Sequence, residues 1–138
     1  MFNNWVVPIF ALGTSIAFAQ PNDEVLLRVR VTDVAATDYY PETSDCPREH
    51  ECIQFYFWFR YKANVREVIR GNHSLSRVTF ARLQHVPFAR KPRDWYVLLV
   101  RCGESVRSTV GVEYCVKDEA FADDRVGIER LVGSQHGA

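Results

Sequence analysis

"QFYFWFRYKANVREVIRGN", Gln54–Asn72, is a segment that begins aromatic, turns basic and ends at a Gly-Asn pair. Side chains of a β-strand point alternately to its two faces, so a period of two sorts these residues into two sets. One set is apolar throughout and is predicted to fill a core, whereas the other changes from aromatic to charged. The core-facing set is Ile53, Phe55, Phe57, Phe59, Tyr61, Ala63 and Val65, and the opposite set is Gln54, Tyr56, Trp58, Arg60, Lys62, Asn64 and Arg66.

The alternation of this segment breaks after Val65, where Val68 and Ile69 no longer follow a period of two. An extra residue in a strand bends it and increases its twist, so we expect this long strand to curl. Gly71-Asn72 then predicts a turn. Curved sheets commonly close on themselves, because closure removes exposed strand edges.

The remaining chain predicts four more strands and one helix. Alternating or continuously apolar runs mark the strands, and an acidic first turn with Asp118 as the N-cap marks the helix. Residues 103–111 read as a turn. The strands are expected at Glu24–Val34, Ser76–Gln84, Trp95–Cys102 and Val112–Asp118, and the helix within Asp118–Gly133. The predicted fold is therefore mainly β: a five-stranded closed OB-like barrel with a short C-terminal helix.

The N-terminal residues 1–19 have the pattern of a secretory signal peptide. An apolar run from Trp5 to Phe18 is shorter than the roughly 20 residues that span a bilayer, and it ends in the small-x-small sequence Ala17-Phe18-Ala19. We expect cleavage near Ala19, a single domain over residues 20–138, and a periplasmic or extracellular location without a membrane anchor. A buried N-terminal strand or a retained anchor is the alternative.

The charges of the chain balance overall, with 17 Lys and Arg against 17 Asp and Glu, but they are distributed unevenly. Acids dominate residues 23–51 and 113–130, and bases dominate residues 60–107. The basic middle could face an acidic partner, or the blocks could neutralise each other across the fold.

Four cysteines, Cys46, Cys52, Cys102 and Cys115, predict two disulfides in an exported chain. Three pairings are possible, and we predict the local one, Cys46–Cys52 with Cys102–Cys115. The sequence "CPREHEC" also offers Cys46, His50 and Cys52 as metal ligands. Because no second ligand pair follows at zinc-site spacing, we expect no metal.

Three segments resemble the netrin modules, the proteins similar to tissue inhibitors of metalloproteinases, and especially their short exported bacterial members. They are "YKANVREVIRGN" (61–72), "WYVLLV" (95–100) and "EYC" (113–115) followed by an acidic helix. The resemblance implies a barrel, export and protein binding. The inhibitors of that family begin with a cysteine whose amine and carbonyl chelate the target's zinc. This chain would begin at Gln20-Pro21, so the resemblance does not imply zinc-directed inhibition.

No catalytic constellation or cofactor motif stands out, since the histidines are scattered and no phosphate-binding glycine loop is present. We expect a non-catalytic binding or accessory module with a protein partner rather than nucleic acid. An inhibitor of a hydrolase acting through surface loops and a small periplasmic hydrolase are the alternatives. The candidate binding face is Tyr56, Trp58, Arg60 and Lys62, and a candidate basic loop carries Arg90, Lys91 and Arg93. Either the C-terminal helix or the 35–51 loop could instead cover Tyr56 and Trp58.

Overall fold

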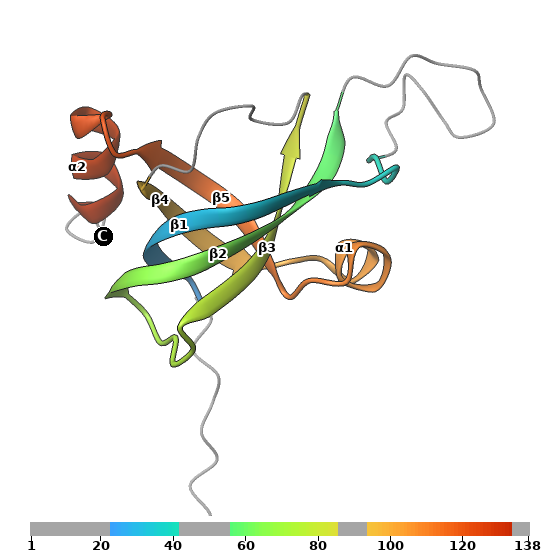
Figure 1. Ribbon diagram of the computed structural model, residues 1–138, viewed down its shortest axis with the longest axis horizontal. Coiled ribbons are helices and arrows are strands. Elements are labelled where there is room, and N and C mark those ends of the chain that lie inside the picture. Colours follow the sequence, from blue (N-terminus) through green and yellow to red (C-terminus); the bar gives the residue numbers. More distant parts are fainter. Residues whose placement is uncertain (1–22, 42–55, 86–93, 134–138) are drawn as a thin grey trace, which may run out of the picture.

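The computed structural model describes residues 23–41, 56–85 and 94–133, and these ranges form a closed five-stranded barrel with two short helices (Figure 1). The predicted signal peptide, the Cys46–Cys52 pair and the basic loop of Arg90, Lys91 and Arg93 lie outside the described residues. The elements are β1 (Val25–Ala36), β2 (Phe57–Arg70), β3 (Arg77–Gln84), β4 (Asp94–Arg101), α1 (Glu104–Val110), β5 (Tyr114–Phe121) and α2 (Arg125–Gly133).

The strands follow the order β1-β2-β3-β5-β4 around the barrel, and β4 pairs with β1 to close it. All neighbours are antiparallel except β3 and β5, which are parallel and are joined by only two residue pairs, Phe80–Tyr114 and Ala81–Cys115. The first half of β1 pairs with β4 on one side and with β2 on the other, whereas its second half pairs with β2. The predicted fold class, mainly β with a closed five-stranded OB-like barrel and a C-terminal helix, is confirmed.

The two faces of β2 separate as the period of two predicts. Phe59, Tyr61 and Ala63 are buried in the barrel interior, whereas Lys62 and Asn64 between them are exposed. The register with β1 shifts by one residue at Arg66, because Glu67 pairs with Arg28 while Val65 pairs with Val29. The predicted bulge is therefore present where the alternation breaks.

Aromatic rings form a continuous column inside the barrel. The Tyr61 and Phe80 rings stack with centroids 5.4 Å apart, and the Phe80 ring meets Trp95 edge-on at 5.7 Å. Trp95 in turn stacks on Phe121 at 5.6 Å. Pairs of this geometry add roughly 0.5–1.5 kcal/mol each beyond the area that they bury. Aliphatic side chains of β1 and β4 fill the rest of the core: Val25, Leu27, Val29, Val97 and Leu99.

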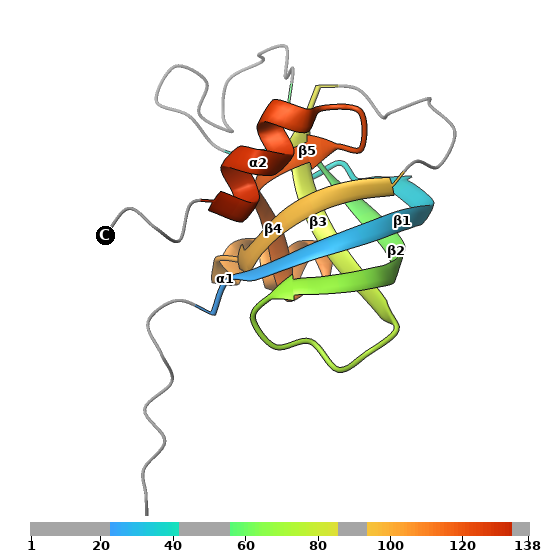
Figure 2. The same cartoon turned by 90° about the vertical axis from the view of Figure 1, so that its left-hand side faces the viewer.

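The two helices lie on opposite sides of the barrel, as the two views in Figures 1 and 2 show. Helix α1 occupies residues predicted to be a turn, and its Val106 and Val110 are buried against the outer side of the barrel. It ends at Gly111, whose φ of 77° is favourable for glycine. The turn prediction was wrong because two valines spaced four residues apart give this short helix an apolar face.

Helix α2 begins later than predicted. Strand β5 continues to Phe121, whose ring joins the core, and the Oδ1 atom of Asp124 accepts a hydrogen bond from the Gly127 N–H at 2.9 Å. Asp124 is thus the N-cap, and Asp118 instead forms an ion pair with Arg130. The hydrogen bonds from Arg130 lower the pKa of the Asp118 carboxyl.

Cys102 and Cys115 form a disulfide with an S–S distance of 2.01 Å, as predicted. It ties the end of β4 to the start of β5 and encloses α1 in the loop between them. Both cysteines are buried, with relative exposures of 4% and 7%. Closing a loop of this length stabilises a fold by about 3 kcal/mol in the chain-entropy account.

The two faces of β2 can be tested by a matched pair of substitutions. Phe59→Ala should lower the free energy of unfolding by about 3–5 kcal/mol because it leaves a cavity in the core. Lys62→Ala, three residues along the same strand but exposed, should change it by less than about 0.5 kcal/mol. Urea unfolding followed by circular dichroism measures both, and equal effects would contradict the assignment of the faces.

Candidate functional site

The candidate binding face lies on the outer side of β2 and β3, near the start of β2. Trp58 is opposite Leu83 in the strand register, and the Tyr56 ring lies 6.0 Å from the ring of His85. Tyr56 retains 57% and Leu83 38% of their accessible surface. Leu83 and His85 were not among the predicted site residues. Val78 and Phe80 are apolar at alternate positions of β3, and this period of two in the sequence places Leu83 on the outer side of the strand.

Trp58 is partly buried by this chain, whereas Tyr56 is exposed. It packs on a cluster that contains Val106 and Val110 of α1, and Tyr39 packs on the same cluster. The backbone N–H of Trp58 donates a hydrogen bond to the Tyr39 carbonyl at 2.9 Å, and the Thr37 hydroxyl donates one to the Trp58 carbonyl. Of the two predicted covers, the 35–51 segment contributes Tyr39.

The C-terminal helix was the other predicted cover, and the structure places it elsewhere. Leu131 and Ile128 of α2 pack with Leu26 and Leu98 on the opposite side of the barrel. The second element that packs on Trp58 is α1, through Val106 and Val110.

The two predicted cations of the face differ in their surroundings. Arg60 is partly buried, and its guanidinium donates a hydrogen bond to the Val110 carbonyl of α1 at 3.5 Å. Lys62 is exposed. The four predicted residues therefore do not form one open patch. Tyr56 and Lys62 are exposed at the two ends, and Trp58 and Arg60 between them are held under α1.

A polar network occupies the interior of the barrel next to the aromatic column. Arg82 of β3 donates hydrogen bonds from Nε and a terminal nitrogen to the two carboxylate oxygens of Glu119, and its other terminal nitrogen donates to Gln84 Oε1 at 2.7 Å. The Tyr61 hydroxyl donates to the same Gln84 oxygen. The Arg82 guanidinium carbon also lies 5.8 Å from the centre of the Trp95 ring, a cation–π distance.

A bulge in β5 brings Glu119 into this network. Leu99 pairs with Val116 while Leu98 pairs with Asp118, so Lys117 is an extra residue in β5. Val116 packs on the barrel core before the bulge, and Glu119 reaches the inner network after it. Bulges commonly re-aim a side chain in this way. The sequence reading missed both partners, although Arg82 shares the parity of Val78 and Phe80.

Burial raises the pKa of the Tyr61 phenol above its ordinary value, because the ionised form loses its solvation. The hydrogen bond with Gln84 and the charge of Arg82 act in the opposite direction. The hydroxyl is therefore held as a neutral hydrogen-bond donor inside the barrel.

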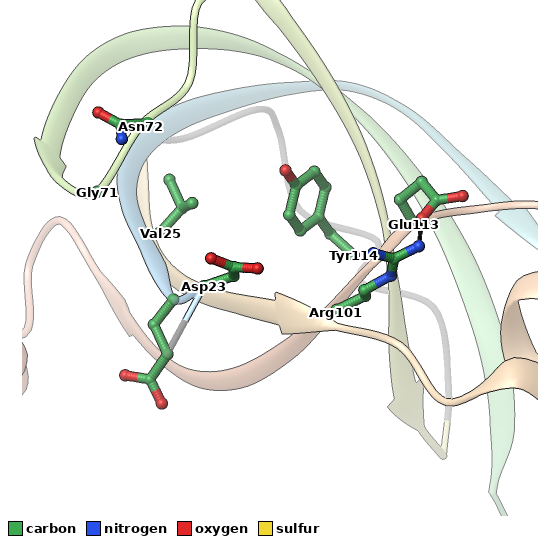
Figure 3. Close-up of a pocket in the computed structure, with 8 residues that line it drawn as sticks. Asp23, Val25, Gly71, Asn72, Arg101, Glu113 and Tyr114 are labelled. Atoms are coloured by element: carbon green, nitrogen blue, oxygen red, sulfur yellow. Dashed lines mark ion pairs between the residues drawn. The ribbon is translucent and has the colours of Figure 1, made fainter. Parts of the chain in front are cut away.

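The end of the barrel opposite the Arg82–Glu119 network is open and forms a cavity of about 510 Å³. Figure 3 shows its walls, which come from the start of β1, the turn after β2, the end of β4 and the start of β5. Most of its charged residues are already paired, since Arg101 lies 3.6 Å from Glu113 and Lys117 contacts Glu24. The lining residues are Asp23, Glu24, Val25, Gly71, Asn72, Arg101, Glu113 and Tyr114.

Comparison of the chain with protein families, with curated proteins and with solved structures gave no match. Within the described ranges, no three His, Cys, Asp or Glu side chains gather closely enough to hold a metal ion. Neither helix described by the structure has the length and apolar character needed to cross a membrane.

The coupling between Arg82 and Glu119 can be measured by a double-mutant cycle. Arg82→Met and Glu119→Leu should each lower the free energy of unfolding by about 1–3 kcal/mol, because each leaves a largely buried charge without its partner. The double variant should lose less than the sum, with a coupling of about 1 kcal/mol or more. The exposed Arg101–Glu113 pair is the control, and its coupling should stay below about 0.5 kcal/mol. Equal couplings in both cycles would contradict the role of the buried pair.

The raised pKa of Tyr61 predicts a loss of stability in alkali. The unfolded chain releases this proton near pH 10, whereas the folded chain retains it to higher pH. The stabilisation is therefore fully present below about pH 10 and is lost as pH rises towards the folded pKa. Tyr61→Phe should make the decline above pH 10 shallower in urea unfolding, with Tyr56→Phe as the surface control. An unchanged slope in Tyr61→Phe would contradict the prediction.

Proposed function

We propose that this protein is an exported, disulfide-stabilised, non-catalytic module that binds a partner protein through the outer face of β2 and β3. We call its apolar end the Tyr56–Leu83 face and define it by Tyr56, Trp58, Leu83 and His85. The observation that carries the proposal is that Tyr56 and Leu83 are both exposed and that Leu83 lies opposite Trp58, whose position is fixed by hydrogen bonds and by α1.

The physical argument is one of preorganisation. Association is weakened by every side chain and loop that must be ordered at the interface, so a rigid aromatic platform favours binding. The Trp58 main chain is held on both sides, through its N–H and its carbonyl, and its side chain is packed on α1. Tyrosine adds a large apolar surface with few rotatable bonds and a polar tip, which is why it is enriched at binding hot spots.

Export is proposed from the N-terminal residues 1–19 and from the cysteine content. The buried Cys102–Cys115 disulfide supports an oxidising compartment, where such bonds persist. A relationship to the netrin modules also remains a proposal, supported by the closed barrel and its C-terminal helix. Since no cysteine stands at the expected mature start, Gln20-Pro21, binding through the strand face is preferred to zinc-directed inhibition.

The double variant Tyr56→Ser/Leu83→Ser tests the proposal. Affinity purification from the envelope fraction of the source organism, followed by quantitative mass spectrometry, should recover one protein with the unmodified chain. Its recovery should fall more than about tenfold with the double variant, as expected when hot-spot residues are removed. Val126→Ser is the matched control, because Val126 is 77% exposed on α2 on the opposite side of the barrel.

Recovery of the same protein at equal levels with both variants would place the contact outside this face. Failure to enrich any protein with the unmodified chain would contradict the proposed class of partner. Photocrosslinking from a reactive side chain at position 56, compared with position 126, gives an independent measurement of the same contact.

A further inference from the structure

Beyond Trp58 and Arg60, which are partly buried against α1, the outer side of β2 and β3 carries a group of exposed cations. Lys62, Arg66 and Arg77 are exposed, and none of the three has an ion-pair partner within the described ranges. Asp33 is the register partner of Lys62 on β1, yet no ion pair joins them. Glu67 is the nearest acid along β2, and it pairs with Arg28 at 3.5 Å.

The positions of these cations are set by the strand register. Lys62 is opposite Thr79, and Asn64, the next outward residue of β2, is opposite Arg77. Lys62 and Arg77 are therefore diagonal neighbours on one face, and Arg66 follows at the bulge. At a rise of about 3.3 Å per residue, Lys62 lies about 20 Å from Tyr56 along β2.

Other arginines of the basic middle segment form ion pairs within the fold. Arg82 is paired with Glu119, and Arg101 and Arg107 both lie within ion-pair distance of Glu113. Cations without an ion-pair partner in the described ranges thus lie at one end of the β2–β3 face, while apolar surface is exposed at the other end.

We infer that this face binds an acidic polypeptide segment, with an apolar side chain resting on Tyr56 and Leu83 and carboxylates facing Lys62 and Arg77. This inference rests on the proposed function and names the chemistry of the partner. The separation of the two ends corresponds to about six residues of extended chain. Complementary charges would steer the encounter and fix the register of the segment on the strands.

A polypeptide fits the face better than the other common polyanions. Single-stranded nucleic acids stack successive bases on a series of aromatic rings. The exposed rings of this face, Tyr56 and His85, lie together at its apolar end, and Trp58 is partly buried. Sulfated polysaccharides carry anionic groups along their length, whereas Tyr56 and Leu83 offer an uncharged surface at one end of the face. A peptide can present an apolar side chain and carboxylates on one backbone.

The test uses purified protein and a fluorescein-labelled peptide with one tryptophan separated by about six residues from a run of glutamates, made in both chain directions. Fluorescence anisotropy should detect binding that weakens as salt rises from about 0.05 M to 0.5 M, because exposed charges are screened. Lys62→Glu/Arg77→Glu should weaken binding about tenfold, since two attractive contacts become repulsive. Arg125→Glu, an exposed cation at the start of α2, is the matched control and should bind normally.

A charge swap separates electrostatic recognition from a change in the fold. A peptide carrying lysines in place of the glutamates should not bind the unmodified protein but should bind Lys62→Glu/Arg77→Glu. The inference is overturned if the glutamate peptide does not bind, if reversal has no effect, or if an oligothymidylate or heparin fragment binds more tightly to the same face.

The two proposals fail in different ways. If the natural partner is lost with Tyr56→Ser/Leu83→Ser but retained with Lys62→Glu/Arg77→Glu, the binding face stands and the acidic partner is wrong. If neither variant loses the partner, the face itself is wrong.

Discussion

The closure of the barrel between β3 and β5 is the constraint on which the rest of the structure depends. Only Phe80–Tyr114 and Ala81–Cys115 connect these strands through their backbones. Beyond this short ladder, the Arg82–Glu119 pair bridges the same strands from inside the barrel. A parallel pair this short offers little main-chain bonding, so side chains must hold the sheet closed. The aromatic column inside the barrel can pack only if they do.

The same closure positions the residues of the proposed contact surface. On the outside of the barrel, Ala81 and the Cys102–Cys115 disulfide belong to the cluster on which α1 rests. Trp58 is held against that cluster, and its neighbours Tyr56 and Leu83 remain exposed. The disulfide and α1 therefore do more than join β4 to β5, because they also hold the Trp58 side chain, which is part of the proposed contact surface.

Among the described residues, the cations of the basic middle segment are ion-paired in one part of the molecule and exposed without an ion pair in another. Charges of the basic middle segment that come near β5 are paired, as in Arg82–Glu119 and Arg101–Glu113. Charges on the outer side of β2 and β3 are not, as Lys62 and Arg77 illustrate. Mutual neutralisation thus applies to one group of cations, while another group stays exposed, and the topology decides which group a residue joins.

The sequence by itself determined the strands, the inner and outer faces of β2, the bulge near Arg66 and the Cys102–Cys115 pairing. These features depend on local periodicity and on short loops, and both can be recognised directly in the sequence. The start of α2, the existence of α1 and the inward position of Glu119 were decided by tertiary structure. Phe121 belongs to β5 because its ring stacks on Trp95 in the aromatic column. Lys117 is the extra residue of a bulge, because Val116 before it and Glu119 after it both face the interior. The cover over Trp58 likewise required contacts between segments far apart in sequence, which no local pattern encodes.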